Sequence, residues 1–218
     1  MPTGLKDKLS EIAQKLDPVF GGHQSRILAL LERIEQLERR VPVGAQAPDF
    51  VLPDQNGSLV SSQELLGKGP LVVVFVRGIW CPYCSEQIRA LVEAAEAFAK
   101  AGIGLAVVTP EVGGRAKQAA DTHAAPFPIL CDVDMGVALS FGCLYMVPPE
   151  EREFLKSKGI DLAERSGSNA GFLPIASGFG IARDGQVLRV FGMPDQRERP
   201  EPMDMLDEMR SALGTAQA

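Results

Sequence analysis

Hydrophobic residues recur at helical spacing through residues 4–40 of the chain. Four of them share one face of a helix in the first half of this segment: Leu5, Leu9, Ile12 and Leu16. Pro18 and Gly21-Gly22 interrupt the pattern, which then resumes at Ile27. Charged residues such as Glu32 and Arg33 occupy the opposite face of the second half. The segment therefore predicts a helical hairpin, in which two amphipathic helices are joined by a Gly-Gly turn.

Strand and helix patterns alternate from residue 44 onward. The continuous apolar run at 71–76 is typical of a strand that is buried on both faces of a sheet. Two hairpins are expected, the first at 49–60 around Asn56-Gly57 and the second at 178–191. Further short strands and helices are expected at 105–108, 111–121, 127–130, 133–140 and 203–213. This alternation predicts an α/β domain with a mixed sheet.

These patterns divide the chain into two parts. Residues 1–41 form the helical hairpin, which we expect either to pack on its own domain or to act as a dimerisation arm, because its apolar stripes need a cover. Residues 42–218 form the α/β domain. Within it, the polar and charged segment near 148–171 is expected to be a surface insertion with one short helix.

Composition and charge exclude several classes of protein. Apolar residues make up 45% of the chain and charged residues 23%, which suits a packed core and excludes global disorder. The net charge of −6 argues against binding to nucleic acid or to an anionic membrane surface. No apolar run reaches the roughly 20 residues that span a bilayer, and the N-terminus lacks the apolar segment of a signal peptide. We therefore expect a cytoplasmic protein.

A Cys-X-X-Cys pair stands where the buried strand at 71–76 gives way to a long helix. Proline is favoured at the first helical position, so Cys81 is expected to be the N-cap and Pro82 the first helical residue. Cys84 then lies in the first turn, where unpaired backbone N–H groups and the helix dipole favour a thiolate. Because a reducing compartment keeps most thiols free, such a close pair predicts redox chemistry.

A zinc half-site is the competing interpretation of the pair. It needs two further ligands, but Cys131 and Cys143 are not spaced as ligands, and His23 and His123 stand alone. We therefore expect no metal and no other cofactor. Cys131 and Cys143 are expected to be buried free cysteines, although either would serve as a resolving cysteine if the fold brought it near. His123 is expected to be structural or exposed.

Two neighbours of the pair are candidates for the site. Trp80 is expected to cover the cysteines and to contribute to the core. Arg77 is the nearest cation in sequence and is able to stabilise a thiolate or to orient an oxyanion. The alternative for Arg77 is a side chain that points into solvent, because side chains alternate in direction at the end of a strand.

Two segments give the chain a family resemblance. Residues 44–50 (GAQAPDF) are similar to the Gly-x-x-Ala-Pro-x-Phe opening of the AhpC/TSA peroxiredoxin and redoxin family. Residues 77–84 (RGIWCPYC) resemble the Arg-Gly-x-Trp-Cys-Pro-Tyr-Cys motif of its peroxiredoxin-like branch. The similarity extends through residues 126–130 (PFPIL) and the second hairpin, and it leaves the N-terminal helices outside. The resemblance implies a thioredoxin fold and a thiol peroxidase or disulfide oxidoreductase.

The resemblance also implies roles for individual residues. Cys84 takes the place of the attacking cysteine, and Cys81 takes the place of a threonine that helps to position the peroxide. The family's later arginine, or the cis-proline of thioredoxins, would fall at or near Ala176, so Arg77 would replace that arginine. Pro82 and Tyr83, together with Trp80, would line the site.

We therefore expect an antioxidant enzyme that reduces hydrogen peroxide or organic hydroperoxides. In this hypothesis Cys84 attacks the peroxide, Cys81 closes a disulfide with it, and thioredoxin or glutathione reduces the pair. The first alternative is a disulfide reductase in which Cys81 attacks and Cys84 resolves. The second is a non-catalytic binding module on the same fold. A homodimer through the N-terminal helices is compatible with each of the three.

Overall fold

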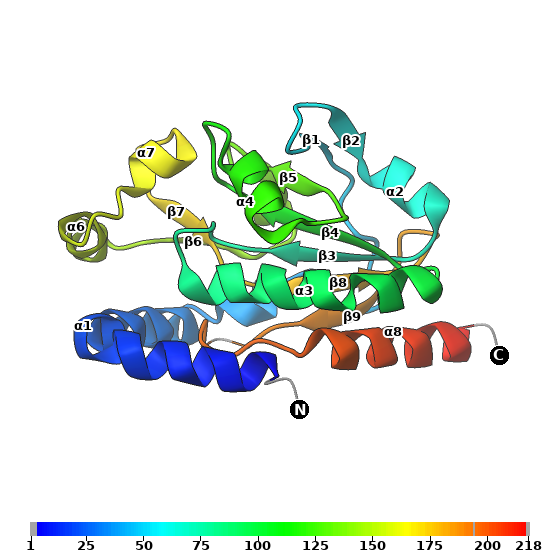
Figure 1. Ribbon diagram of the computed structural model, residues 1–218, viewed down its shortest axis with the longest axis horizontal. Helices are drawn as coiled ribbons and strands as arrows, with labels where there is room; N and C mark the ends of the chain where they lie inside the picture. The colour runs from blue at the N-terminus through cyan, green and yellow to red at the C-terminus, as the bar shows by residue number, and fades with distance from the viewer. Residues whose placement is uncertain (1–3, 194, 217–218) are drawn as a thin grey trace.

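A five-stranded mixed sheet forms the centre of the protein (Figure 1). The computed structural model describes residues 4–193 and 195–216. The strands follow the order β5 (Ile129–Cys131), β4 (Gly104–Thr109), β3 (Leu71–Phe75), β8 (Gly178–Ile181) and β9 (Val187–Phe191). The first three run parallel to one another, and β8 and β9 are antiparallel. The mixed sheet and the second hairpin are thus confirmed.

The central strand β3 is buried on both faces, as its continuous apolar run predicts. Val72 and Val74 pack on one side of the sheet, and Val73 and Phe75 pack on the other. Alternate side chains point to opposite faces of a strand, so this short segment joins two separate clusters of the core. In the second cluster, Phe75 contacts the rings of Phe141 and Phe179, with centroids 5.2 and 5.9 Å away.

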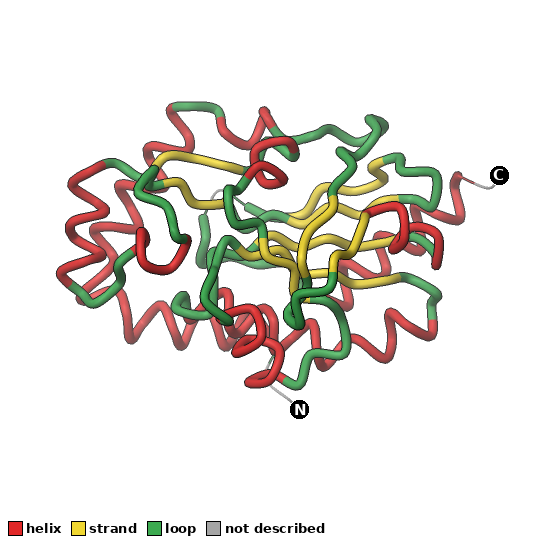
Figure 2. Tube along the Cα trace, turned by 90° about the horizontal axis from the view of Figure 1, so that it is seen from above, coloured by secondary structure: helices red, strands yellow, loops and turns green. Residues whose placement is uncertain are grey.

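Helices cover both faces of the sheet, which forms the middle layer in Figure 2. On one face lie α1 (Leu5–Arg33), α3 (Pro82–Lys100) and α8 (Pro202–Ala216). The other face is covered by the hairpin of β1 (Val51–Pro53) and β2 (Leu59–Ser61), and by α2 (Ser62–Lys68) and α5 (Gly136–Ser140). The short helices α4 (Arg115–His123) and η1 (Gln36–Arg39) complete these layers. The expected first hairpin is confirmed.

The predicted helical hairpin of residues 1–41 is wrong, because no turn separates its two helical stretches. α1 is one continuous helix that runs through Pro18 and through Gly21 and Gly22, neither of which has the positive φ of a tight turn. The glycines stay helical because the two halves of α1 pack on different clusters of the core. The helix changes direction along its length (Figures 1 and 2), and an internal proline is a usual cause of such a bend.

The insertion near 148–171 contains two helices, where the sequence predicts one. α6 (Pro149–Ser157) and α7 (Leu162–Ser166) lie between the antiparallel strands β6 (Leu144–Met146) and β7 (Phe172–Pro174), which the sequence analysis does not identify. The insertion is not merely a surface feature, because Leu155 and Leu162 are buried with Ile27 and Leu31 of α1. It forms a third core cluster with the second half of α1.

Candidate active site

The two cysteines lie at the N-terminus of α3, directly after the loop that follows β3. Cys81 is the N-cap and Pro82 the first helical residue, as the sequence predicts. The backbone carbonyl of Cys81 accepts hydrogen bonds from the N–H groups of Cys84 and Ser85, both at 3.0 Å. Cys81 is 1% exposed and Cys84 is 0% exposed, and both are free thiols. The first helical turn therefore places both sulfurs inside the protein.

The loop before the helix is shaped by Gly78 and Glu111. Gly78 has a φ of +128°, and a Cβ atom there would lie 2.4 Å from the carboxyl carbon of Glu111. The Ile79 N–H donates to Glu111 Oε2 at 2.7 Å, and Arg165 Nη1 donates to Oε1 at 3.1 Å. Only glycine allows both the positive φ and this close approach, so the carboxylate can support the loop that carries the cysteines.

Arg77 lies against the first cysteine and does not point into solvent. Its Nη2 donates to Cys81 Sγ at 2.8 Å, and the side chain is 5% exposed. Its guanidinium lies 5.3 Å from the centre of the Trp80 ring, and Trp80 Nε1 donates to the Arg77 carbonyl at 2.9 Å. This cation–π contact and hydrogen bond hold the guanidinium in one orientation beside the sulfur.

A second buried arginine, Arg199, lies close to the cysteines, and no pattern in the sequence predicts it. Arg199 lies just before α8, where its Nε donates to Gln87 Oε1 of α3 at 3.1 Å. Its charge acts on both cysteines, and burial lowers the pKa of Arg199 itself. Nothing in the charged segment around residue 199 marks this side chain as buried, because its environment is made by a helix that is distant in sequence.

The positive charges of Arg77 and Arg199 favour a negative charge on the cysteine pair. A hydrogen bond from the Cys81 thiol lowers the pKa of Cys84 well below its usual range, against the effect of burial, and Arg77 and Arg199 lower it further. Burial raises the pKa of Cys81 well above its usual range, so this sulfur keeps the shared proton. Arg77 donates to Cys81 Sγ, whereas Cys84 has the lower pKa. This arrangement fits a single negative charge that is shared by the two sulfurs.

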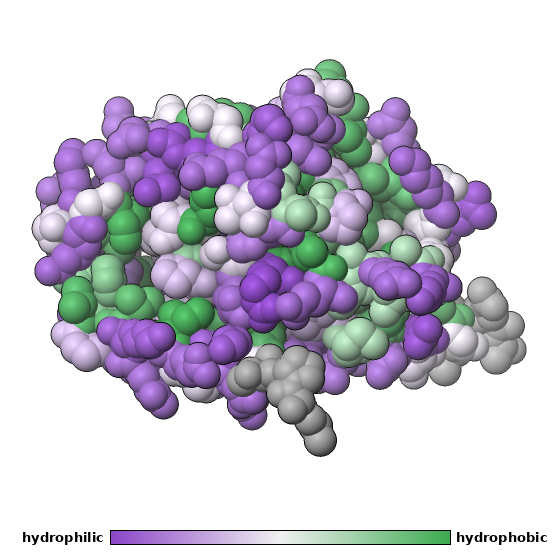
Figure 3. All heavy atoms as spheres, in the orientation of Figure 1, coloured by the Kyte–Doolittle hydropathy of each residue, from purple (hydrophilic) through white to green (hydrophobic). Residues whose placement is uncertain are grey.

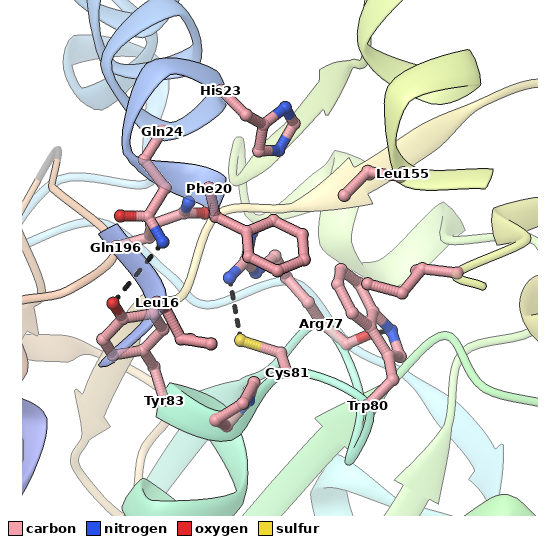
Figure 4. Close-up of a pocket in the computed structure, with 12 residues that line it drawn as sticks. Leu16, Phe20, His23, Gln24, Arg77, Trp80, Cys81, Tyr83, Leu155 and Gln196 are labelled. Atoms are coloured by element: carbon pink, nitrogen blue, oxygen red, sulfur yellow. Dashed lines mark hydrogen bonds between the residues drawn. The ribbon is translucent and has the colours of Figure 1, made fainter. Parts of the chain in front are cut away.

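A cavity of about 150 Å³ leads to the first of the two sulfurs (Figure 4). It is lined by Leu16, Phe20, His23, Gln24, Arg77, Trp80, Cys81, Pro82, Tyr83, Leu155, Ile160 and Gln196. Cys81 is among these residues and Cys84 is not. Four of the lining residues come from α1, so the N-terminal helix forms a wall of the site. No pattern in the sequence places α1 at the site.

The remaining predicted residues lie outside this cavity. Ala176 is buried between β7 and β8 and is not among the lining residues, and the described peptide bonds near it, including that of Pro174, are trans. Cys131 donates to the Glu111 carbonyl at 2.7 Å, and burial raises the pKa of the fully buried Cys143. His123 Nε2 lies 3.0 Å from Ser85 Oγ.

Comparisons with known proteins agree with this architecture. Residues 43–160 match the AhpC/TSA family. A chloroplastic peroxiredoxin Q of Oryza sativa subsp. japonica is 31% identical over 103 residues, which are 47% of each chain. The thiol-disulfide oxidoreductase ResA of Bacillus subtilis is 30% identical over 98 residues, which are 43% of this chain and 52% of ResA. The matched region thus spans about half the length of these relatives.

Solved structures extend the likeness beyond this region. The peroxidoxin BcpB of Mycobacterium tuberculosis superposes with a TM-score of 0.61 and 20% identity, covering 79% of this chain and 96% of that one. A cysteine-to-serine mutant of the peroxiredoxin 6 of Arenicola marina gives a TM-score of 0.66 with 18% identity, over 81% of this chain and 76% of its own. These likenesses confirm the expected thioredoxin fold.

Proposed function

The chain belongs to the AhpC/TSA family, and from that premise we propose that it is a thiol-dependent peroxidase with an antioxidant role. Its substrates are hydrogen peroxide or organic hydroperoxides, and its reaction cycles through a reversible Cys81–Cys84 disulfide. One observation carries the proposal: two buried thiols lie close to Arg77 and Arg199, and the first of them, Cys81, lines a cavity. Its cysteines suit a reducing compartment, so we place it in the cytoplasm.

In the proposed oxidation, Cys81 meets the peroxide, because Cys81 and not Cys84 lines the cavity. This reverses the order expected from the sequence. The shared proton moves to Cys84 as the Cys81 thiolate attacks the terminal peroxide oxygen. An S–O bond forms, the O–O bond breaks, and the departing alkoxide or hydroxide takes up a solvent proton. Arg77 favours the charge that develops beside Cys81.

The second step closes the disulfide. Cys84 attacks the sulfenic sulfur of Cys81, the S–S bond forms, and the S–O bond breaks. The leaving hydroxide takes the proton of the Cys84 thiol and departs as water. Two thiols and one peroxide thus give a disulfide, an alcohol or water, and one further water. An external thiol then reduces the pair, and Cys84 suits the leaving position because low-pKa thiols leave faster.

Serine variants of the two cysteines test this order. We expect Cys81→Ser to abolish peroxide consumption, because the sulfur that reaches the cavity is gone. Cys84→Ser should react once and accumulate a sulfenic acid at Cys81, which dimedone labelling and mass spectrometry detect. Cys131→Ser is the matched control and should keep full turnover. Full turnover by Cys81→Ser would overturn the assignment.

Disulfide reduction is the second candidate function. The likeness to ResA favours it, as does a Cys-X-X-Cys pair whose first sulfur faces the cavity. In this reaction Cys81 attacks a substrate disulfide and Cys84 resolves the mixed disulfide. Rapid insulin reduction without peroxide consumption would favour this function, and the absence of both activities would favour a binding module.

A further inference from the structure

Side chains of α1 and α6 cover the cysteine pair and block the approach of a folded redox partner. Leu16 and Phe20 of α1 and Leu155 of α6 line the cavity that Cys81 faces (Figure 4), and Ile160 lines it as well. The exposed fraction of Cys81 is only 1%. A protein thiol would reach this sulfur only if α1 moved away and exposed its buried leucines. The open cavity of about 150 Å³ can take the thiol-bearing side chain of a small molecule while the rest of that molecule stays outside, whereas a folded protein would have to displace α1.

A buried histidine–carboxylate pair stands in the wall of this cavity. His23 Nδ1 lies 2.5 Å from Glu151 Oε2, and the two side chains are 5% and 4% exposed. Glu151 also accepts a hydrogen bond from Arg26, and Phe154 stacks on the imidazole with centroids 5.3 Å apart. Among the described residues, the other ring nitrogen of His23 has no hydrogen-bond partner. His23 itself lines the cavity (Figure 4).

We propose that the cavity admits a low-molecular-weight thiol as the reductant of the Cys81–Cys84 disulfide, and that His23, oriented by Glu151, is the base that ionises this thiol. The inference rests on the proposed disulfide cycle of the pair. Gln24 adds a recognition group, because its Oε1 is buried without a partner at the same cavity and can accept an N–H from the thiol's backbone. A cysteine-containing peptide thiol matches both features.

The proposed reduction of the Cys81–Cys84 disulfide is a thiol–disulfide exchange. His23 Nε2 takes the proton of the incoming thiol, and the Glu151 carboxylate supports the resulting imidazolium. The new thiolate attacks Cys81 Sγ, the S–S bond breaks, and its electron pair leaves on Cys84. A second molecule of the thiol then attacks the mixed disulfide as its thiolate, releases the oxidised small disulfide, and leaves Cys81 to take the proton held by His23.

The environment of His23 suits a base and not an acid. Burial lowers its pKa, opposed by the contact with Glu151 and aided by the charges of Arg77 and Arg26, so the ring is neutral at pH 7. A free thiol with a pKa of about 8.5 is mostly protonated at that pH. An apolar cavity disfavours its ionisation further, which is why a base inside the cavity accelerates the exchange.

The test uses the full-length protein with its disulfide formed by diamide, so that it does not depend on peroxide turnover. Reduction is followed in a stopped-flow instrument by the fluorescence of Trp80, the single tryptophan, which adjoins the pair. We expect glutathione to reduce the disulfide faster than thioredoxin at equal thiol concentration. We expect His23→Gln to slow reduction by glutathione about 10²-fold, the usual contribution of a general base.

The pH profile separates a catalytic role from a structural one. The wild-type rate should fall as pH drops through the pKa of His23, below its ordinary 6.5, and His23→Gln should lose this inflection. Glutamine keeps an N–H for Glu151, and circular dichroism checks the fold. Glu151→Gln, which weakens the positioning of His23, should give a smaller loss. His123→Gln, a variant of the other histidine, is the matched control and should keep both rate and profile.

Two results would overturn the inference: faster reduction by thioredoxin than by glutathione, or a pH profile that His23→Gln leaves unchanged. The experiment distinguishes failure of this inference from failure of the proposed peroxidase function. If the diamide-formed disulfide is reduced through His23 but peroxide never oxidises the pair, the peroxidase assignment is wrong and the thiol site stands.

Discussion

At the scale of single residues, two arginines from distant parts of the chain lie close to the cysteine pair. Arg77 touches Cys81 Sγ from the loop after β3, and Arg199 approaches from the segment before α8. Both are buried, and each has a side-chain nitrogen without a hydrogen-bond partner, Nε in Arg77 and Nη2 in Arg199. Buried cations are costly unless they are paired, so the negative charge on the thiols and the positive charge on the arginines stabilise one another.

Removing the more distant arginine should raise the pKa of the reactive pair. We expect Arg199→Gln to shift the thiolate titration upward by about 1–3 units, the range for loss of an opposite charge beside a titrating group. Glutamine can still donate to Gln87, which preserves the packing. The measurement is the ultraviolet absorbance of the thiolate against pH. Arg183→Gln, an exposed arginine at the β8–β9 turn, is the control, and equal titration curves for the two variants would contradict the role of Arg199.

At the scale of elements, α1 unites parts of the protein that the sequence pattern treats as separate. Its first half packs on the main cluster through Leu5 and Leu9, and its second half packs on the insertion through Ile27 and Leu31. Between the two halves, Leu16 and Phe20 reach the cavity. A bend near Pro18 allows one helix to serve all three contacts, because proline removes a helical hydrogen bond and clashes with the preceding turn.

Truncating a buried leucine of the second half should weaken this packing. Leu31 is 4% exposed, and we expect Leu31→Ala to lower the free energy of unfolding by about 2–5 kcal/mol, the usual cost of such a cavity. Val19, on the same helix, is 49% exposed. Val19→Ala should therefore change the free energy of unfolding by no more than about 0.5 kcal/mol. Urea unfolding followed by circular dichroism measures both. Similar losses for both variants would show that α1 does not pack as described.

At the scale of the whole molecule, the site lies where two core clusters meet. Trp80 packs against the main cluster and against the cluster that α1 forms with the insertion. Buried residues of both halves of α1 pack on these clusters within the chain, and a homodimer through this helix stays a prediction. Polar side chains cover much of the face in Figure 3, with hydrophobic residues among them. Among the described residues, no helix is long and apolar enough to cross a membrane.

The His23–Glu151 pair should make the stability of the molecule depend on pH. The pKa of His23 is lowered in the folded protein, chiefly by burial, so the unfolded chain binds a proton first as pH falls below 6.5. The pKa of Glu151 is also lowered, by Arg26 and His23 against the effect of burial, so its contribution is lost below 4.5. Both pKa values are lower in the folded protein, so both groups make the protein less stable as the pH decreases.

Denaturant unfolding of wild type and His23→Gln across this range measures the effect. The wild-type free energy of unfolding should decrease as pH falls from 7 toward 5, by about 1.4 kcal/mol for each unit by which the His23 pKa is depressed. His23→Gln should show a smaller decrease, because glutamine does not titrate. A decrease of equal size in both proteins would assign the acid sensitivity to other groups.

The sequence by itself determined the order of the main elements and the place of the reactive pair. The run at 71–76, the hairpin residues and the Cys-Pro-Tyr-Cys motif act through local geometry, and local geometry is read from neighbouring residues. The N-cap at Cys81 and the helix that begins at Pro82 are clear examples. The second insertion helix and the strands β6 and β7 escaped prediction because short elements with little periodicity take their form from packing.

Only the tertiary structure decided what surrounds the two sulfurs. His23 meets Glu151 across 128 positions of the chain, and Arg199 meets Gln87 across 112. No local pattern encodes such contacts, because they arise when separate elements pack together. The same packing keeps α1 helical through Gly21 and Gly22, directs Cys81 and not Cys84 toward the cavity, and brings the N-terminal helix over the site. Burial and charge are properties of the folded chain, so the pKa values of the two thiols are determined at that level.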